Sequence, residues 1–287
     1  MWDKNANDEA IEAWNGVLFD KFTRFRHILT DGLSVHGAAL MKAHPPPRGG
    51  RVLDIGCGFG DTTITIAREG GPDGVAHGVD AAPRFIEVAR REAADAGVPN
   101  ATFDVVDPQK EPPGGPYDHA FSRMGLMFFS SPVIALRNIR RSLRSGARLT
   151  AVVWRRREDN PWLYDAQQAV EAIVPHPETT DQPTCGPGPF SMAGPDTVSA
   201  QLLAAGFLRP TFERHDHEIR IGNSLDEAIE FATALGQAGE LLRLAGADAE
   251  KYRPAVLAAL REVMTPHTRP DGVFAGSSTW MISAVVP

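Results

Sequence analysis

The 287-residue sequence predicts an α/β protein with a doubly wound, parallel sheet. Short apolar runs alternate with segments of helical periodicity between residues 51 and 154. One of these runs, Val52–Ile55, leads directly into a glycine-rich turn and a polar helix start. The composition, 43% hydrophobic and 23% charged, is that of a globular protein with a sizeable core. Together these observations favour one open sheet covered by helices.

Helices are predicted ahead of the sheet. Apolar residues recur at spacings of three and four over 8–29, which predicts an amphipathic helix. We expect Thr30-Asp31-Gly32 to break this helix and a second one to continue to Met41. Pro45-Pro46-Pro47 then ends helical structure. Residues 1–44 are therefore expected to form an N-terminal helical cap segment.

The segment 45–155 is expected to hold the core of the sheet. Five strands are predicted, over 52–55, 75–79, 102–106, 119–122 and 149–154. Helices are predicted to begin at Asp61, Pro83 and Pro132, because acidic residues and prolines favour the first helical turn. The last of these helices is expected to end near Gly146.

The regular alternation of predicted strands and helices ends at Trp154. The predicted elements there are helices over 161–174 and 195–205 and strands over 211–221 and 279–286. Ser224-Leu225-Asp226-Glu227 is a capping box that opens a helical insertion. We expect residues 156–287 to complete the fold and to carry a helical substrate cap at about 223–265.

Charge and cysteine content exclude several classes of protein. The 29 basic and 36 acidic residues give a net charge of -7 with no basic stripe, which argues against a nucleic-acid partner. The charged first twenty residues predict no signal peptide, and the longest apolar run is too short for membrane insertion. Two cysteines, Cys57 and Cys185, favour a reducing compartment, so we expect a cytoplasmic protein. A homodimer is left open.

The glycine-rich turn carries the strongest functional signal. Gly56, Gly58 and Gly60 follow Asp54, and small residues at this spacing let the backbone lie against an extended ligand. A dinucleotide pyrophosphate would be repelled by Asp54 and would require glycine where the chain has Asp61. A ligand with an ammonium and a sulfonium would be attracted instead. A nicotinamide oxidoreductase is therefore disfavoured.

Two further acids follow predicted strands. Asp80 ends the second strand and Asp107 the third, and ligands of open α/β sheets bind beyond the carboxyl ends of the strands. The Asp80 carboxylate can accept both hydroxyls of a ribose, and that of Asp107 can accept the exocyclic amine of adenine. The three acids in this order predict one ligand site at this edge.

These segments resemble the successive motifs of the class I S-adenosylmethionine (SAM) methyltransferases, and most of all the UbiE-like small-molecule group of ubiquinone and menaquinone biosynthesis. The resemblance lies in residues 52–61, 78–80, 106–107, 117–123 and 143–149. It implies a Rossmann-like sheet with N-terminal helices and a helical cap inserted before the last strand. It also implies SAM as cofactor, S-adenosylhomocysteine as product and no metal.

The resemblance assigns roles to individual residues. Asp54 and the three glycines would line the methionine side of SAM, Asp80 would hold the ribose and Asp107 the adenine. The backbone around Ser122 and Arg123 would face the amino-acid end. The full set of expected cofactor-binding residues is Asp54, Gly56, Cys57, Gly58, Gly60, Thr62, Asp80, Ala81, Val106, Asp107, Pro108, Ser122 and Arg123.

The chain departs from the family pattern at two places. Pro108 stands where a residue usually offers its backbone N–H to the adenine, and proline has none. Gln109 could supply a replacement hydrogen bond. The usual turn before the fifth strand appears here as Leu143-Arg144-Ser145-Gly146-Ala147, which changes no chemistry.

Methyl transfer by in-line displacement needs mainly positioning of the acceptor, which can lower the barrier by roughly 7–11 kcal/mol. A base is needed only where the acceptor must lose a proton, and His217 and His36 are the catalytic candidates. His215 and His217 share one face of the sixth strand, with Asp216 on the other. His119 lies inside the fourth strand. Each of these histidines could equally be structural.

Aromatic residues are the candidates for the acceptor side. They are Trp154, Trp162, Phe190 and Phe231. An aromatic, apolar cover suits a small, partly apolar metabolite with an oxygen, nitrogen or carbon nucleophile. We therefore expect a SAM-dependent methyltransferase with a small-molecule partner. The alternative is a non-catalytic protein that binds SAM or serves as a scaffold.

Overall fold

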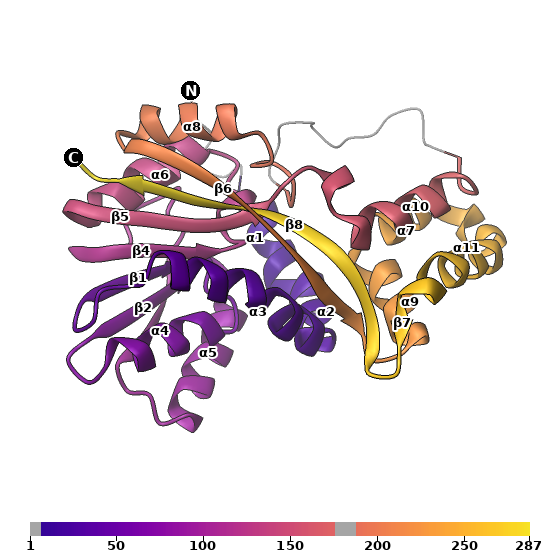
Figure 1. The fold of residues 1–287 in the computed structure, drawn as a ribbon, viewed down its shortest axis with the longest axis horizontal. Coiled ribbons are helices and arrows are strands. Elements are labelled where there is room, and N and C mark those ends of the chain that lie inside the picture. The colour runs from indigo at the N-terminus through magenta and orange to yellow at the C-terminus, as the bar shows by residue number, and fades with distance from the viewer. Residues whose placement is uncertain (1–6, 176–187) are drawn as a thin grey trace.

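The computed structural model describes residues 7–175 and 188–287 (Figure 1). Their sheet has the strand order β3-β2-β1-β4-β5-β8-β6, with β7 paired to β8. The strands are β1 (Arg51–Ile55), β2 (Val75–Asp80), β3 (Ala101–Val105), β4 (Tyr117–Arg123), β5 (Leu143–Trp154), β6 (Leu208–Gly222), β7 (Thr268–Arg269) and β8 (Gly272–Val285). The first five strands pair in parallel, whereas β8 runs antiparallel to both β5 and β6. The expected doubly wound sheet is confirmed, with an antiparallel edge.

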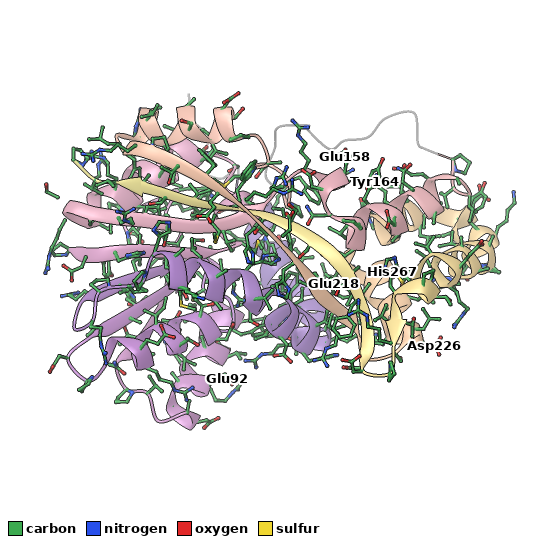
Figure 2. All side chains as sticks on the ribbon, in the orientation of Figure 1. Glu92, Glu158, Tyr164, Glu218, Asp226 and His267 are labelled. Carbon is green, nitrogen blue, oxygen red and sulfur yellow. The ribbon has the colours of Figure 1, made fainter. Side chains whose placement is uncertain are left out.

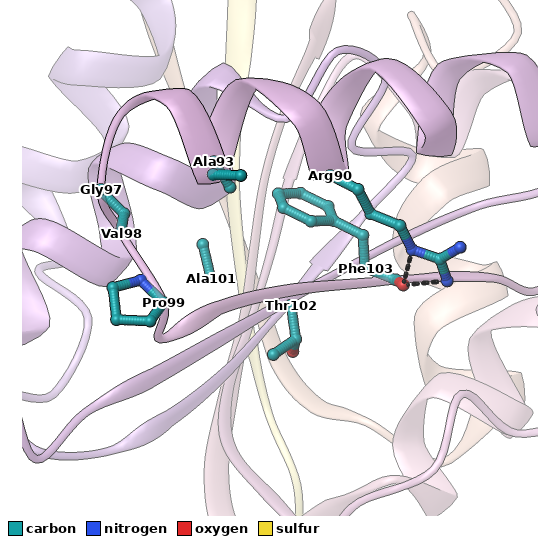
Figure 3. A pocket seen from close by; sticks show the side chains of 9 residues that line it. Arg90, Ala93, Gly97, Val98, Pro99, Ala101, Thr102 and Phe103 are labelled. Carbon is teal, nitrogen blue, oxygen red and sulfur yellow. Dashed lines mark hydrogen bonds between the residues drawn. The ribbon is translucent and has the colours of Figure 1, made fainter.

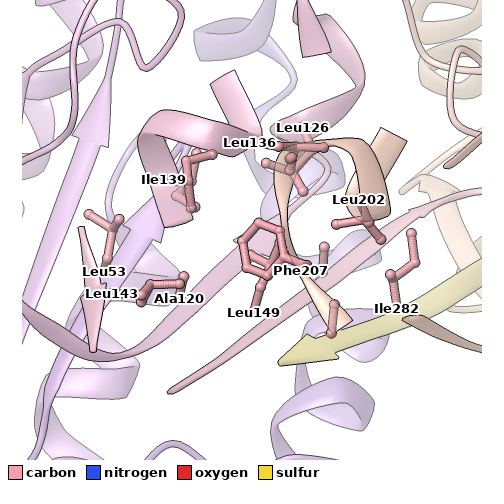
Figure 4. Packing of buried hydrophobic residues seen from close by; sticks show 14 of the residues in the cluster. Leu53, Ala120, Leu126, Leu136, Ile139, Leu143, Leu149, Leu202, Phe207 and Ile282 are labelled. Atoms are coloured by element: carbon pink, nitrogen blue, oxygen red, sulfur yellow. The ribbon is translucent and has the colours of Figure 1, made fainter. Parts of the chain in front are cut away.

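Helices cover both faces of this sheet (Figure 1). On one face lie α3 (Arg26–Ala43), α4 (Asp61–Gly70) and α5 (Pro83–Asp95), and on the other α6 (Pro132–Arg141) and α8 (Pro195–Ala205). The apolar stripe of α3 and α5 packs on Val52, Ala76 and Phe121. On the opposite face, Leu53 and Leu149 pack against Ile139 and Leu202 (Figure 4). This alternation along β1 buries both of its faces, as expected of a central parallel strand.

The N-terminal helices differ from the predicted pattern. The chain forms α1 (Asp8–Ala13), a π-helical turn (Trp14–Leu18) and α2 (Phe19–Arg24) before α3. The break expected at Thr30-Asp31-Gly32 is wrong, because α3 runs through these residues and the helix axis is interrupted at Phe25 instead. Gly32 serves a close approach: a Cβ there would lie 2.9 Å from the carbonyl oxygen of Arg220 on β6.

Two other predicted boundaries are also corrected. The helix expected to end near Gly146 ends at Arg141, and Leu143 already pairs with Tyr117 of β4. Both strands of the β6–β8 pair are longer than predicted, since residues 272–278 continue beyond the sheet to pair with β6. The alternation of apolar and polar residues that indicates a strand is weak in 272–278, because small residues such as Gly276 and Ser277 interrupt it.

A helical layer lies at the far end of the β6–β8 pair (Figure 1). It consists of α7 (Pro161–Glu171), α9 (Leu225–Leu235), α10 (Gln237–Leu244) and α11 (Ala249–Met264). These helices share an apolar core with Ile219 and Ala275 of the two long strands. Surface ion pairs join neighbouring elements, as between Arg26 of α3 and Glu92 of α5 (2.8 Å) and between Arg269 of β7 and Glu218 of β6 (2.6 Å). Figure 2 labels Glu92 and Glu218.

Candidate functional site

The strand order brings the predicted motifs together at the carboxyl edge of the sheet. Because β1 pairs with both β2 and β4, the turn after Ile55 lies between Asp80 and Arg123. The N–H of Gly58 donates to one oxygen of Asp80 (3.1 Å), and the N–H of Ala82 donates to the other (3.0 Å). Each carboxylate oxygen keeps a further lone pair, so Asp80 can still accept hydroxyl groups.

The three glycines of the turn have different surroundings. All have positive φ, between 53° and 82°. A Cβ on Gly56 would lie 2.7 Å from the Cα of Gly125, and one on Gly60 would lie 2.8 Å from the Cβ of Ala89, so these two allow close packing within the protein. A Cβ on Gly58 would meet only Phe85, at 3.9 Å. Gly58 is therefore the position where a ligand can approach the backbone.

Asp54 is more enclosed than the sequence suggested. Only 1% of the residue is exposed, and its Oδ2 accepts the hydroxyl of Thr63 at 2.6 Å. Burial raises the pKa of Asp54 to about 7, although Thr63 and Arg123 act in the opposite direction. At neutral pH its carboxylate is therefore only partly ionised, which weakens the electrostatic argument made from the sequence. Direct contact of Asp54 with a ligand stays a prediction.

Arg123 ties the end of β4 to the start of α4. Its guanidinium forms an ion pair with Asp61 (2.5 Å), and its Nε donates to the hydroxyl of Thr62 (3.0 Å). The neighbouring Ser122 is fully buried and donates to the carbonyl of Ile55 (2.8 Å). These contacts hold residues on the two sides of the turn in fixed positions.

The surroundings of Asp107 correct one expectation. Gln109 does not offer its backbone N–H to a ligand, because that N–H donates to Oδ1 of Asp107 (2.9 Å). Its side chain is also engaged: Oε1 accepts from the Ser130 hydroxyl (2.9 Å) and the Ser131 N–H (2.8 Å). Gln109 is only 2% exposed, so these bonds fix the loop from within.

The N-terminal segment, expected as a helical cap, packs on this carboxyl edge of the sheet, called the cofactor crevice below, through contacts that the sequence did not identify. Asn7 donates to Oδ2 of Asp107 (3.1 Å), and the N–H of Arg84 donates to Asn15 (3.0 Å). Trp14 makes edge contacts with Phe85 (6.4 Å) and Phe128 (4.9 Å). Asn7 and Asp107 are separated by 100 residues, and no local pattern predicts their pairing.

The predicted histidines divide into buried and exposed ones. His36 is 0% exposed, and burial together with His215 lowers its pKa to about 3. It therefore cannot serve as the base expected from the sequence. His119 is also buried, and its Nε2 forms a hydrogen bond with the Thr150 hydroxyl (2.8 Å). Burial lowers the pKa of His119 to about 4. His217 is exposed and lies 2.5 Å from the Glu218 carbonyl oxygen, and its catalytic role stays a prediction.

Three of the four predicted acceptor-side aromatics form one row. Trp154 contacts Trp162 (ring centroids 5.3 Å apart), and Trp162 stacks on Phe231 (6.1 Å, 16° between planes). Phe190 lies elsewhere and packs under the guanidinium of Arg157 at 5.3 Å. The indole N–H of Trp162 is buried with no hydrogen-bond partner among the described residues. This row joins the end of β5 to the helical layer.

A hollow beside α5 and β3 is not a competing site (Figure 3). It has a volume of about 530 Å³ and is lined mainly by apolar residues such as Ala93, Val98 and Pro99. Arg90 on its wall is engaged, since it donates to the Phe103 carbonyl at 3.0 and 2.6 Å. No acid–base pair faces this hollow.

Two features are absent from the described part of the chain. In residues 7–175 and 188–287, no three His, Cys, Asp or Glu side chains are grouped so that they could bind a metal. None of the helices there combines the length and the apolar character that crossing a membrane requires. Cys185 lies outside the described residues.

Comparisons with known proteins agree with this architecture. The methyltransferase-domain family matches residues 47–184. Aklanonic acid methyltransferase DauC of Streptomyces sp. (strain C5) is 37% identical over 116 residues, which cover 39% of this chain and 52% of that protein. Demethylmenaquinone methyltransferase of Staphylococcus aureus is 26% identical over 148 residues, which cover 51% of this chain and 61% of that protein. The chain thus spans about half of the first relative and three-fifths of the second.

A solved structure extends the likeness to nearly the whole chain. The YcgJ protein from Bacillus subtilis aligns over 89% of this chain and 97% of its own, with a TM-score of 0.55. Sequence identity is 20%, so this comparison concerns the fold alone.

Proposed function

We propose that the protein is a SAM-dependent methyltransferase for small, partly apolar acceptors, on the premise that its residues 47–184 match the methyltransferase-domain family. The observation that supports this most directly is the open Gly58 backbone opposite Asp80. The Gly58 N–H donates to the Asp80 carboxylate (3.1 Å), which ties the turn to this acid, and a Cβ on Gly58 would meet only Phe85, at 3.9 Å.

The residues of the crevice suit the parts of SAM. Asp80 has lone pairs for the ribose hydroxyls, and the Asp107 carboxylate can exchange the Asn7 amide for an adenine amine. The turn at Gly58 and the backbone near Arg123 would hold the amino-acid end. SAM supplies an electrophilic sulfonium methyl group. The chain has to place the acceptor nucleophile in line with that methyl group and exclude water.

The aromatic row is the proposed acceptor wall. Trp154 is 4% exposed and lies at the carboxyl end of β5, next to the proposed methyl-transfer position. The names of two relatives contain aklanonic acid and demethylmenaquinone, and an apolar acceptor of similar character fits an aromatic surface. The buried, unpartnered N–H of Trp162 would favour an acceptor with a carbonyl or hydroxyl oxygen at that place.

Isothermal titration with SAM and S-adenosylhomocysteine tests the crevice, using the variants Gly58→Val and Gly146→Val. Both glycines have positive φ (53° and 78°), so both variants carry similar backbone strain. We expect Gly58→Val to lose SAM binding by at least about tenfold, because its side chain enters the crevice, whereas Gly146→Val keeps it. Absence of binding in the wild type would refute the proposed function.

Transfer of labelled methyl groups to small molecules separates an enzyme from a protein that only binds SAM. A panel of hydroxylated naphthalenes, naphthoquinones and quinolones is the appropriate set of acceptors. SAM binding without transfer to any of them or to a metabolite extract would favour the non-catalytic alternative. Cytoplasmic location and a homodimer stay predictions.

A further inference from the structure

Two histidines that are 179 residues apart in the sequence meet at the acceptor end of the sheet. His36 on α3 and His215 on β6 place their Nδ1 atoms 2.8 Å apart, with the rings nearly perpendicular. His215 is in register with Thr279 of β8, and Thr279 with Trp154 of β5. The His36 ring also contacts Trp154, with ring centroids 5.8 Å apart. The pair therefore borders the aromatic row.

Helix α3 connects this pair to the glycine-rich turn. Gly37 follows His36, and a Cβ on Gly37 would lie 3.0 Å from the side chain of Arg123. Arg123 in turn binds Asp61 and Thr62 at the start of α4. One helical turn thus contacts both the cofactor crevice and the histidine pair.

The hydrogen bonds determine which nitrogens carry protons. The hydroxyl of Ser277 donates its only proton to the carbonyl of His217 (2.6 Å). Ser277 must therefore accept from Nε2 of His36, which lies 2.8 Å away. Since His36 is neutral, its Nδ1 is an acceptor. The Thr279 hydroxyl lies 3.2 Å from that nitrogen and also 3.2 Å from the His215 carbonyl oxygen, to which it can donate instead. Two lone pairs cannot face each other at 2.8 Å, so Nδ1 of His215 carries the proton between the two rings. The remaining nitrogen of His215, Nε2, carries a lone pair.

We propose that Nε2 of His215 is the base that removes the proton from a hydroxyl acceptor, and that His36 is a positioning residue that fixes the tautomer of His215. This inference rests on the proposed function. In the reaction the acceptor oxygen forms a bond to the methyl carbon while the carbon–sulfur bond of SAM breaks. The sulfur keeps the electron pair of that bond, and the hydroxyl proton moves to Nε2 of His215. The Nδ1–H bond to His36 is kept in both states.

The surroundings of His215 favour its deprotonated form, mainly through burial. Burial and the neighbouring His217 lower the pKa of His215, and Asp216 and Glu213 raise it by a smaller amount. Two elements pack against this histidine pair. Among the described residues, α3 places His36 there, and β8 places the hydroxyls of Ser277 and Thr279 there. His215 is thus a free base at neutral pH.

Two acceptors of different acidity distinguish a base from a structural histidine. The first is 1-naphthol, which is protonated at neutral pH, and the second is 2-hydroxy-1,4-naphthoquinone, which is already ionised. His215→Asn keeps a donor toward His36 but lacks Nε2. We expect its kcat on 1-naphthol to fall by about 100-fold or more, within the range of general-base catalysis, with turnover of the ionised acceptor and SAM binding kept.

Other histidine variants test the positioning role. His36→Phe removes the acceptor for the Nδ1 proton and should lower kcat on 1-naphthol and shift its pH profile, whereas His36→Asn should restore part of both. His44→Asn, at the C-cap of the same helix, is the control and should leave both activities unchanged. Nitrogen-15 NMR of labelled histidines should find protons on Nδ1 of His215 and Nε2 of His36.

Several outcomes would overturn the inference. They are equal losses on both acceptors in His215→Asn, a loss confined to His217→Asn, the opposite tautomer at His36, and a wild type that methylates only the ionised acceptor or neither. Failure of the wild type to bind SAM would refute the proposed function itself, which the same titration detects separately.

Discussion

At the scale of single residues, a ligand in the crevice can bind only those groups that are not already engaged in packing or hydrogen bonds within the protein. Gly56 and Gly60 are required by neighbouring backbone and side chains, so only Gly58 presents its backbone to a ligand. Asp54, the most conspicuous acid of the sequence, is engaged by Thr63 and buried. Sequence spacing places these residues on one turn, but it does not tell which of them face outward.

The variant Asp54→Asn separates the stability cost of burying this carboxylate from any role of its charge in ligand binding. Because burial raises the pKa of Asp54 to about 7, the native protein loses stability as pH rises from the ordinary carboxyl range through 7. The variant lacks this cost, so its free energy of unfolding should exceed that of the wild type at pH 8 and approach it at pH 4. Urea denaturation at both pH values measures the difference. Equal stabilities at pH 8 would contradict the burial argument.

SAM titration of the same variant addresses function. If the partial negative charge of Asp54 acts on the ligand, affinity should fall by about tenfold at pH 8 and less at pH 6. A pH-independent affinity equal to that of the wild type would show that Asp54 has only a structural role.

At the scale of elements, helix α3 is the piece on which the site depends most. It contacts β6 through Gly32, the histidine pair through His36 and the cofactor crevice through Gly37. Amphipathic periodicity predicts this helix, yet Gly32 was interpreted as a break. A glycine that ends a helix and one that permits close packing look identical in sequence, and only the partner strand distinguishes them.

Gly32→Ala should therefore loosen α3 from β6. The added Cβ would lie 2.9 Å from the Arg220 carbonyl oxygen, and overpacking of this kind costs about 1–3 kcal/mol. Gly70→Ala, on α4, is the matched control because nothing lies within 4 Å of its Cβ. Thermal unfolding should show a lower midpoint for Gly32→Ala and an unchanged or slightly higher one for Gly70→Ala. A stabilised Gly32→Ala would contradict the close approach.

At the scale of the whole molecule, the parallel half of the sheet follows from the sequence and the antiparallel edge does not. Residues 51–154 have clear apolar runs separated by helical segments, so the strands of this part were predicted closely, except that β5 begins at Leu143 rather than at Leu149. The β6–β8 pair was predicted too short mainly on the β8 side, because residues 272–278, with Gly276 and Ser277, lack the apolar alternation that signals a strand. Ser277 of that part is a hydrogen-bond partner of His36 in the proposed site.

Buried histidines make the stability of the fold depend on pH. Burial lowers the pKa of His36 to about 3 and that of His119 to about 4, from the ordinary histidine pKa of 6.5. As pH falls below 6.5, the unfolded chain therefore binds protons at both residues before the folded chain does. Stability is therefore full above pH 6.5 and falls on acidification, by up to about 1.4 kcal/mol per pH unit for each histidine. Asp54 acts oppositely over part of this range.

Denaturation midpoints between pH 7.5 and 4.5 measure this dependence. Below pH 6.5 two histidines outweigh one aspartate, so the wild type should lose stability from pH 6.5 to 4.5, and the double variant His36→Asn with His119→Asn should have a flatter profile there. A wild-type stability that rises as pH falls from 6.5 to 4.5 would refute the assignment of neutral buried histidines.

The long β6–β8 pair has one more consequence. The chain leaves the sheet on β6, forms α9, α10 and α11, and returns on β7 and β8 beside the strand that it left. Such a layout makes residues 223–267 a cassette whose two ends are held by one strand pair. Exchange of this cassette between related chains is expected to change the choice of acceptor while donor affinity is inherited from the recipient.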